Sequence, residues 1–452
     1  MTTIWLKNPL ALFDGLTELN SAGLVIQDKI IIEVLNKNQM PSMPIDQTFN
    51  ASEYVILPGL INTHHHFYQT LTRAYPEALN KELFPWLKTL YPVWAGLEPD
   101  MLAVATELAL TELMLSGCTT AADHHYLFPQ GLEYAIDIQV EAAKKVGTRV
   151  TLTRGSMSLG TDQGGLPPQS TVQSEQIIVD DSERLIYEYH EPHEGAMIQI
   201  ALAPCSPFSV TTELMKESAK LAHQHHVHLH THLAETLDEE EFCLKRFGLR
   251  TVDYLESVGW LHNKTWLAHG IHFNDEEIQR LGRAGVGICH CPNSNMMLAS
   301  GICRTLELEQ AGSPVGLGVD GSASNDHSNL ISEARQALYL QRLRYGAARM
   351  THLDAYRLAT SGSAQVLGRS DIGRLKVGYQ ADLALFKLDE LRFSGHHDPL
   401  AALLLCGAQR AHRVMIAGQW TVVDGLPVHL DLPELMQRHQ AAARRLAQKA
   451  RA

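Results

Sequence analysis

Short apolar runs alternate with longer amphipathic segments through the middle of the chain. Eight runs of strand length fall between residues 54 and 319, and segments with helical periodicity follow them. Strands that alternate with helices predict a parallel sheet, and eight such units predict an α/β fold of the (β/α)8 TIM-like barrel type. The predicted strands are 54–57 continued by 60–61, 119–123, 149–152, 198–203, 227–233, 265–268, 286–291 and 315–319.

Helical spacing of apolar residues is clearest in five segments that separate or follow these strands. They are 99–116, 213–223, 239–247, 275–284 and 329–345, and several end at a glycine or next to one. Residues 429–452 also have helical spacing and carry many basic side chains. We therefore expect a C-terminal helix that is solvated on the surface.

The two ends of the chain share a different texture. Residues 4–6, 24–27 and 29–32 near the start, and 381–388, 413–416 and 419–423 near the end, are strand-like and separated by turn residues. We expect one small β-sandwich domain built from residues 1–57 and 374–428. The barrel then spans residues 58–373, and the C-terminal helix spans 429–452.

Composition narrows the possible partners. The 452 residues are 45% hydrophobic and 19% charged, with a formal charge of −13, which is typical of a globular protein and argues against nucleic-acid polymers or anionic membranes as partners. We find no apolar run of membrane-spanning length and no signal peptide. Seven scattered cysteines without a CxxC pair favour a reducing, cytoplasmic location. A small molecule is the expected partner.

Three consecutive histidines end the first predicted barrel strand. Alternate residues of a strand face the same side, so His64 and His66 point together and His65 points away. The active site of a barrel lies at the C-terminal ends of its strands. We therefore predict that His64 and His66 bind a metal and that His65 has a structural role.

Other predicted strands also end in groups that can bind a metal or move a proton. Strand five ends at His232, whereas His228 and His230 lie deeper on the same face and are expected to be interior residues. Strand eight ends at Asp320. Three imidazoles and one carboxylate suit a divalent transition metal, with zinc preferred and iron as the alternative. The end of strand four, IALAPCSP, lacks the lysine of bridged two-metal sites, so we expect one ion.

If the metal activates a water molecule, other side chains at the strand ends can take part in catalysis. A bound metal lowers the pKa of its water toward about 7, and Asp320 can accept the proton that this water loses. Glu235 can pass a proton to a ring nitrogen or a leaving amine. Alternatively, its carboxylate only stabilises the N-terminus of the following helix through the helix dipole. His269 can hydrogen-bond to the water or a developing oxyanion, or serve as an additional ligand.

Several motifs together resemble the amidohydrolase superfamily, specifically its cytosine, guanine and S-adenosylhomocysteine deaminase-like branch. The resemblance covers nearly the whole chain and is carried by the following motifs: PGLINTHHH, HLAE, LAHG, CHCPNSNMMLASG, LGVDGSASND and GRLKVGYQADLALF. It implies a mononuclear, commonly zinc-dependent enzyme in which water deaminates a heterocycle. The ligands implied are His64, His66, His232 and Asp320, with Glu235, His269 and Asp320 in catalysis.

The resemblance also points to a substrate ring. Gln69 stands where guanine deaminases read the purine edge, but Cys205 occupies the place of their arginine. The combination of the motifs HHHFYQTLTRA, ADHHYLFP and APCSPFSV most resembles bacterial enzymes that convert 8-oxoguanine to urate and ammonia. Oxidation at C8 turns N7 of the purine from a hydrogen-bond acceptor into an N–H donor. An arginine that faces this edge would then be unfavourable, so its replacement by Cys205 fits 8-oxoguanine. Further expected pocket residues are Trp86 in a lid after strand one, Arg154 and His125.

Three other interpretations stay open from the sequence. The same fold and metal could serve guanine or isoxanthopterin, or an N-alkylated hydroxytriazine, whose hydrolases share the HHH-like and APCSPF-like motifs. A non-enzymatic, histidine-rich metal-binding or scaffold protein is the alternative from another class. Dimers are common in the resembling family, so a homo-oligomer is possible, but no interface can be identified in the sequence.

Overall fold

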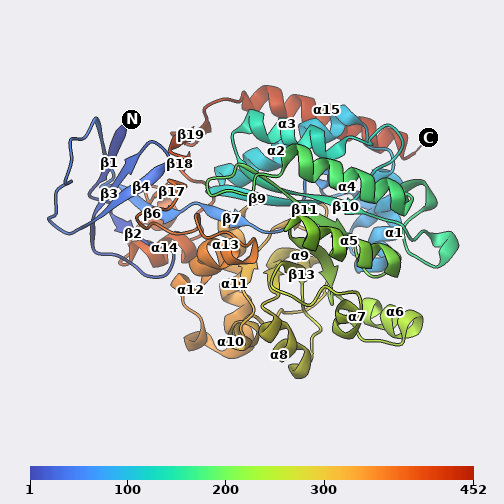
Figure 1. Cartoon of the computed structure of the whole chain (residues 1–452). Helices are drawn as coiled ribbons and strands as arrows, with labels where there is room; N and C mark the ends of the chain where they lie inside the picture. Colours follow the sequence, from blue (N-terminus) through green and yellow to red (C-terminus); the bar gives the residue numbers. More distant parts are fainter. Residues whose placement is uncertain (452) are drawn as a thin grey trace.

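An eight-stranded parallel sheet forms the centre of the computed structural model, which describes residues 1–451 (Figure 1). Neighbouring strands follow chain order from β7 through β9 to β15, and helices surround them, which confirms the predicted barrel. The strands are β7 (Leu60–Asn62), β9 (Cys118–His125), β10 (Arg149–Ser156), β11 (Ile198–Pro204), β12 (Leu229–Leu233), β13 (Thr265–His269), β14 (Gly287–His290) and β15 (Val315–Leu317).

The first predicted strand is divided into two strands that belong to different sheets. β6 (Tyr54–Pro58) pairs antiparallel with β17 (Leu383–Lys387) outside the barrel, whereas β7 pairs with β9 inside it. Gly59 lies at the crossing, where an added Cβ would come within 2.1 Å of Thr119 Oγ1. A residue without a side chain therefore lets the chain pass from one sheet to the other.

Strands one and eight meet where the barrel closes. The Thr63 N–H donates to the Leu317 carbonyl (2.9 Å), and the Val319 N–H donates to Asn62 Oδ1 (2.9 Å). Beyond these contacts β8 (His65–His66) pairs in parallel with β16 (Asp320–Gly321), with Asp320 opposite His65. Closure thus brings the histidines of the first strand beside the aspartate of the last.

The helices predicted from apolar spacing are all present, with ends that shift by a few residues. They are α2 (Pro99–Leu115), α5 (Thr212–His225), α6 (Leu237–Phe247), α8 (Asp275–Ala284) and α11 (Leu330–Tyr345). The remaining helices in and around the barrel are α1 (Leu83–Trp94), α3 (Ala135–Val146), α4 (Glu175–Tyr189), α7 (Thr251–Ser257), α9 (Pro292–Met297), α10 (Thr305–Ala311), α12 (His352–Arg357), α13 (Ser363–Val366) and α14 (Pro399–Leu405).

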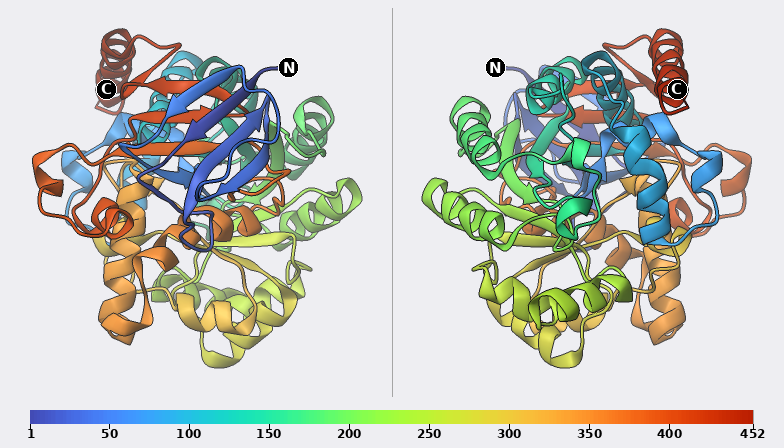
Figure 2. Two further views of the ribbon diagram at one scale, coloured as in Figure 1. Left: turned by 90° about the vertical axis from the view of Figure 1, so that its left-hand side faces the viewer. Right: turned by 90° about the vertical axis from the view of Figure 1, so that its right-hand side faces the viewer.

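A β-sandwich from both chain ends lies beside the barrel, as predicted (Figure 2). One sheet has the order β4-β3-β1-β5 and the other β2-β6-β17-β18-β19-β20. Buried side chains of both sheets, including Leu24, Ile56 and Met415, form one core. The other strands are β1 (Thr3–Lys7), β2 (Ala11–Leu12), β3 (Ser21–Gln27), β4 (Ile30–Asn36), β5 (Gln47–Asn50), β18 (Arg413–Ile416), β19 (Gln419–Val423) and β20 (Leu426–Pro427).

The C-terminal helix α15 (Leu432–Lys449) is not simply solvated, which corrects the sequence-based expectation. Leu435, Ala442 and Leu446 are buried, and the helix lies along α2 (Figure 1). His439, on the same stripe, has its Nε2 3.0 Å from Thr70 Oγ1. These positions are spaced at three to four residues, so they form one apolar face among the basic residues.

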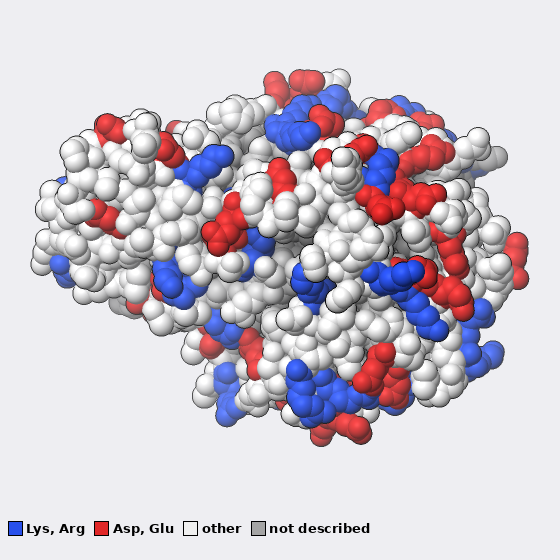
Figure 3. Space-filling model, in the orientation of Figure 1, with Lys and Arg blue, Asp and Glu red and all other residues white. Residues whose placement is uncertain are grey.

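Acidic and basic side chains are mixed over the face of the molecule that Figure 3 shows. Within residues 1–451, we find no helix that is long and apolar enough to cross a membrane.

A buried ion pair joins the barrel to the sandwich. The Arg149 guanidinium on β10 donates to both carboxylate oxygens of Asp382 (3.0 and 3.2 Å), and the two side chains are 0% and 2% exposed. The Asp382 carboxylate also accepts from the Ala417 N–H (2.7 Å). Both charges are shielded from water, so each is stabilised mainly by the other, and removal of one would leave the other buried and uncompensated.

Replacing Arg149 with methionine should destabilise the protein by about 3–5 kcal/mol, because the Asp382 carboxylate would stay buried without its cation. Urea denaturation would measure the free energy of unfolding. Lys144→Met is the control, since Lys144 and its partner Glu141 are 52% and 70% exposed and such pairs contribute little. Equal losses in the two variants would contradict the expectation.

Candidate functional site

The predicted metal ligands converge at the C-terminal ends of the barrel strands. His64 Nε2 and His66 Nε2 each lie 3.2 Å from Asp320 Oδ1, and His232 Nε2 lies 3.2 Å from His66 Nε2. The site is a His/Asp metal site: two overlapping groups of four side chains have ligand atoms within 4.8 Å of one another. Both groups contain His64 and His232; one adds His66 and His124, and the other adds His269 and Asp320.

Backbone carbonyls select the tautomer of two of these histidines. His66 Nδ1 is 2.7 Å from the carbonyl of His124, and His232 Nδ1 is 2.7 Å from the carbonyl of Cys205. A carbonyl only accepts, so each Nδ1 carries the proton and each Nε2 presents a lone pair to the site. Burial also lowers the pKa of His232 to about 3, which keeps its ring neutral.

These lone pairs fit a cation. His64 Nε2 is buried and makes no hydrogen bond of acceptable geometry, even though Asp320 Oδ1 is 3.2 Å away. Ligand atoms at 2.0–2.1 Å from a tetrahedral zinc ion lie about 3.4 Å apart, close to the separations found here. Nitrogen lone pairs and a carboxylate oxygen would otherwise repel one another. The residues present therefore suit a divalent transition metal.

His269 and Glu235 lie together next to this cluster. His269 Nε2 is 3.3 Å from Glu235 Oε2 and 4.0 Å from Asp320 Oδ2. Burial lowers the pKa of His269 to about 4, so the ring is neutral. Burial, followed by the charges of Asp320 and Glu239, raises the pKa of Glu235 well above its usual value. Glu235 is therefore suited to carry a proton at neutral pH.

Serine hydroxyl groups hold the two carboxylates in place, and the Glu239 carboxylate holds the backbone of Glu235. Ser294 Oγ donates to Asp320 Oδ2 (2.6 Å), and Ser300 Oγ donates to Glu235 Oε1 (3.3 Å). The buried Glu239 carboxylate accepts from the Glu235 N–H (3.1 Å). These contacts leave Asp320 Oδ1 facing the histidines and Glu235 Oε2 facing His269.

The backbone is strained at three strand ends. Ala234, His269 and Asp320 have φ angles of 54°, 74° and 62°, in the left-handed region that non-glycine residues rarely adopt. Each costs on the order of 1–3 kcal/mol and persists only where surrounding contacts enforce it. The strain coincides with the residues that turn side chains into the site.

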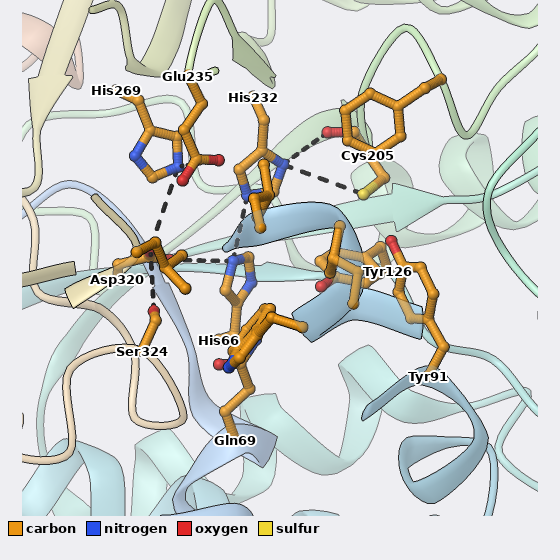
Figure 4. A pocket seen from close by; sticks show the side chains of 15 residues that line it. His66, Gln69, Tyr91, Tyr126, Cys205, His232, Glu235, His269, Asp320 and Ser324 are labelled. Atoms are coloured by element: carbon orange, nitrogen blue, oxygen red, sulfur yellow. Dashed lines mark hydrogen bonds and ion pairs between the residues drawn. The ribbon is translucent and has the colours of Figure 1, made fainter. Parts of the chain in front are cut away.

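A cavity opens beside the cluster, and Figure 4 shows its lining. Three of the five predicted substrate-binding residues line it: Gln69, Trp86 and Cys205. The segment that contains Trp86, which was expected to form a lid, is helix α1, and Trp86 Nε1 donates to the Ala323 carbonyl (3.2 Å). The complete lining is His66, Gln69, Leu83, Trp86, Leu87, Tyr91, Tyr126, Cys205, Phe208, His232, Glu235, His269, Leu298, Asp320 and Ser324.

Gln69 depends on the small residue beside it. An added Cβ on Gly321 would lie 1.9 Å from Gln69 Oε1. Gln69 Oε1 also accepts from the Ala323 N–H (3.3 Å). The glycine after Asp320 therefore leaves the space in which the amide lies at the cavity wall.

Arg154 and His125 are not brought to the cavity. The Arg154 guanidinium donates to Asp181 Oδ2 (2.5 Å) on α4 and lies 3.7 Å from the centre of the Phe128 ring. His125 Nε2 donates to the Leu127 carbonyl (2.6 Å). Both side chains make their hydrogen bonds outside the cavity.

His65, predicted to point away from the metal ligands, has its Nε2 2.9 Å from Ser328 Oγ.

Two tyrosines that line the cavity were not predicted from the sequence. Tyr91 lies on α1 and Tyr126 directly follows β9, and Figure 4 shows both beside Cys205. Tyr126 follows His124 and His125, so a closer look at the end of strand two could have found it. Tyr91 lies in the segment that was expected to form a lid, but the helix over 83–94 was not predicted, so the direction of Tyr91 could not be inferred.

Comparisons with known proteins find similar sequences and a similar fold. The chain is 67% identical over 443 residues to an 8-oxoguanine deaminase of Pseudomonas aeruginosa, covering 98% of this chain and 99% of that protein. An isoxanthopterin deaminase from an unknown prokaryotic organism is 33% identical, covering 87% and 86%. The structure of atrazine chlorohydrolase TrzN from Arthrobacter aurescens TC1 complexed with zinc is 32% identical, with a TM-score of 0.93 and coverage of 97% and 100%.

The sequence model of the amidohydrolase family matches residues 55–421, which include the barrel and most of the C-terminal part of the sandwich. The match spans every histidine and carboxylate of the site described above. The chain belongs to the amidohydrolase family.

Proposed function

We propose that this protein is a metal-dependent deaminase that hydrolyses 8-oxoguanine to urate and ammonia. The observation that carries the proposal is the 67% identity, over almost the full length of both chains, to the 8-oxoguanine deaminase of Pseudomonas aeruginosa. The neutral histidines, the aspartate and the protonated glutamate of the site supply the groups that such a reaction needs.

His64, His66, His232 and Asp320 would hold the ion, with zinc as the preferred metal because of the imidazole-rich donor set. A divalent metal bound there would lower the pKa of a water molecule toward neutrality. His269 is assigned outside the ligand set. Its Nδ1 faces Asn295 Nδ2 at 3.0 Å, so Nδ1 accepts and Nε2 carries the proton.

The side chains around the ion move the protons of the reaction. Asp320 accepts a proton as water attacks the carbon that bears the amino group. Glu235 delivers its proton to the adjacent ring nitrogen, and His269 Nε2–H stabilises the developing negative charge on oxygen. Asp320 then passes the proton that it accepted to the amino group, the carbon–nitrogen bond breaks and ammonia leaves, and the hydroxyl proton returns to Glu235 as the carbonyl forms.

The lining of the cavity suits an oxidised purine. Among its described lining residues none is a lysine or an arginine. The family resemblance puts Cys205 where guanine deaminases carry an arginine. Burial raises the pKa of Cys205 to about 12, so this position is uncharged. A neutral wall accepts the N7–H of 8-oxoguanine better than a cationic donor would. Gln69 is proposed to read another polar edge of the ring.

The direct test of the function is ammonia release from a panel of rings. The metal-loaded protein should release ammonia from 8-oxoguanine faster than it releases ammonia from guanine, isoxanthopterin or cytosine, and faster than it releases the alkylamine from an N-alkylated hydroxytriazine. Urate formation, followed by its ultraviolet absorbance, should match the ammonia in a 1:1 ratio. Faster turnover of isoxanthopterin or of the hydroxytriazine would replace the proposed substrate, and no turnover of any ring would refute the deaminase assignment.

Replacing Glu235 with glutamine should lower kcat by about 10²–10⁴-fold, because an amide cannot deliver a proton to the ring nitrogen. Bound metal, measured by elemental analysis, should stay at the wild-type level since Glu235 is outside the ligand set. Ser300→Ala is the matched control: it removes only the hydrogen bond to Glu235 Oε1 and should cost far less. A glutamine variant with near wild-type kcat would show that another group supplies the proton.

Replacing Cys205 with arginine should shift the preference from 8-oxoguanine toward guanine. Hydrogen bonds to a charged group contribute about 1.5–3 kcal/mol, so the ratio of kcat/KM values for guanine and 8-oxoguanine should rise at least about tenfold. Cys205→Ser, which adds no charge, should keep the wild-type preference. An unchanged ratio in a folded, metal-loaded arginine variant would remove Cys205 from the specificity argument.

A further inference from the structure

His230 lies directly behind one of the proposed metal ligands. Its Nε2 is 2.8 Å from His64 Nδ1, and its Nδ1 is 3.0 Å from the carbonyl of Trp266. The side chain is 1% exposed, and its ring stacks on the Trp266 indole with centroids 4.3 Å apart and planes 14° apart. Both ring nitrogens are therefore engaged, and the ring is held on one face.

The proton positions along this chain follow from the carbonyl at its end. The Trp266 carbonyl only accepts, so His230 Nδ1 carries a proton and, in the neutral ring, Nε2 is an acceptor. His64 Nδ1 must then donate to His230. The remaining nitrogen, His64 Nε2, is left with its lone pair directed at the cluster, and it is buried and has no hydrogen-bond partner.

Trp266 makes this arrangement rigid. Its indole Nε1 donates to the carbonyl of Thr63 (3.1 Å), the residue that precedes His64. One residue of β13 thus holds the backbone of the ligand and, through His230, its side chain. His66 and His232 obtain the same tautomer from backbone carbonyls directly, whereas His64 obtains it from another histidine.

We propose that His230 is a positioning residue that sets the tautomer and ring orientation of His64 for metal binding. The HLHTH segment of strand five then contains one ligand, His232, and the residue that positions a ligand of strand one. This inference rests on the assignment of His64 as a ligand in the proposed function. Groups that orient a metal-bound histidine typically contribute 10- to 100-fold to metal affinity.

The test uses the full chain and Zn²⁺ in competition with a chromophoric chelator, so the readout is affinity rather than activity. His230→Phe keeps a ring against Trp266 but removes the acceptor for His64, and zinc should bind 10- to 100-fold more weakly. His230→Gln returns an acceptor oxygen near the position of Nε2 and should recover most of the affinity. Urea denaturation of the metal-free proteins would show whether each variant is folded.

His228→Phe is the matched control, because His228 lies two residues earlier and its ring also packs on Trp266, edge-on with centroids 6.2 Å apart. It should bind zinc like the wild type. His64→Ala separates the two proposals: if it binds zinc normally, the ligand assignment fails. If His64→Ala loses zinc but a folded His230→Phe protein binds it as tightly as His228→Phe does, the positioning role of His230 is refuted.

Discussion

The site depends on one electrostatic constraint: histidine nitrogen lone pairs and a carboxylate oxygen face one another where no solvent can separate them. His64 Nε2 and His66 Nε2 approach the same oxygen of Asp320 to 3.2 Å, and all three side chains are almost inaccessible to solvent. Such an arrangement is unfavourable unless a cation lies between the groups. The contacts that hold it must therefore be strong and must act from outside the cluster.

Closure of the barrel supplies those contacts. The pairing of β8 with β16 places Asp320 opposite His65, so the histidines of the first strand and the aspartate of the last are neighbours although they are far apart in sequence. Carbonyls of neighbouring strands then accept the Nδ1 protons of His66 and His232. The sheet that forms the core of the fold thus also sets the protonation of the ligands.

The proposed acid is held by a different set of groups. Glu235 lies just beyond β12, where the left-handed Ala234 (φ 54°) turns the chain and Glu239 on α6 accepts the next backbone N–H. Burial and two nearby carboxylates raise its pKa, which suits a group that has to give up a proton. A single barrel therefore keeps one carboxylate paired with histidines and raises the pKa of another, and both lie close to His269.

The sequence alone predicts the barrel, the sandwich and the convergence of His64, His66, His232 and Asp320. The prediction uses two patterns, namely the alternation of side chains along strands and the polar residues at strand ends. These follow from local rules, since a strand turns alternate residues to one side and a barrel gathers strand ends. The tertiary structure alone decided that Arg154 pairs with Asp181, that Tyr91 and Tyr126 line the cavity, and that His230 contacts His64. Those contacts join residues from separate strands and helices, and no local pattern encodes which of them meet.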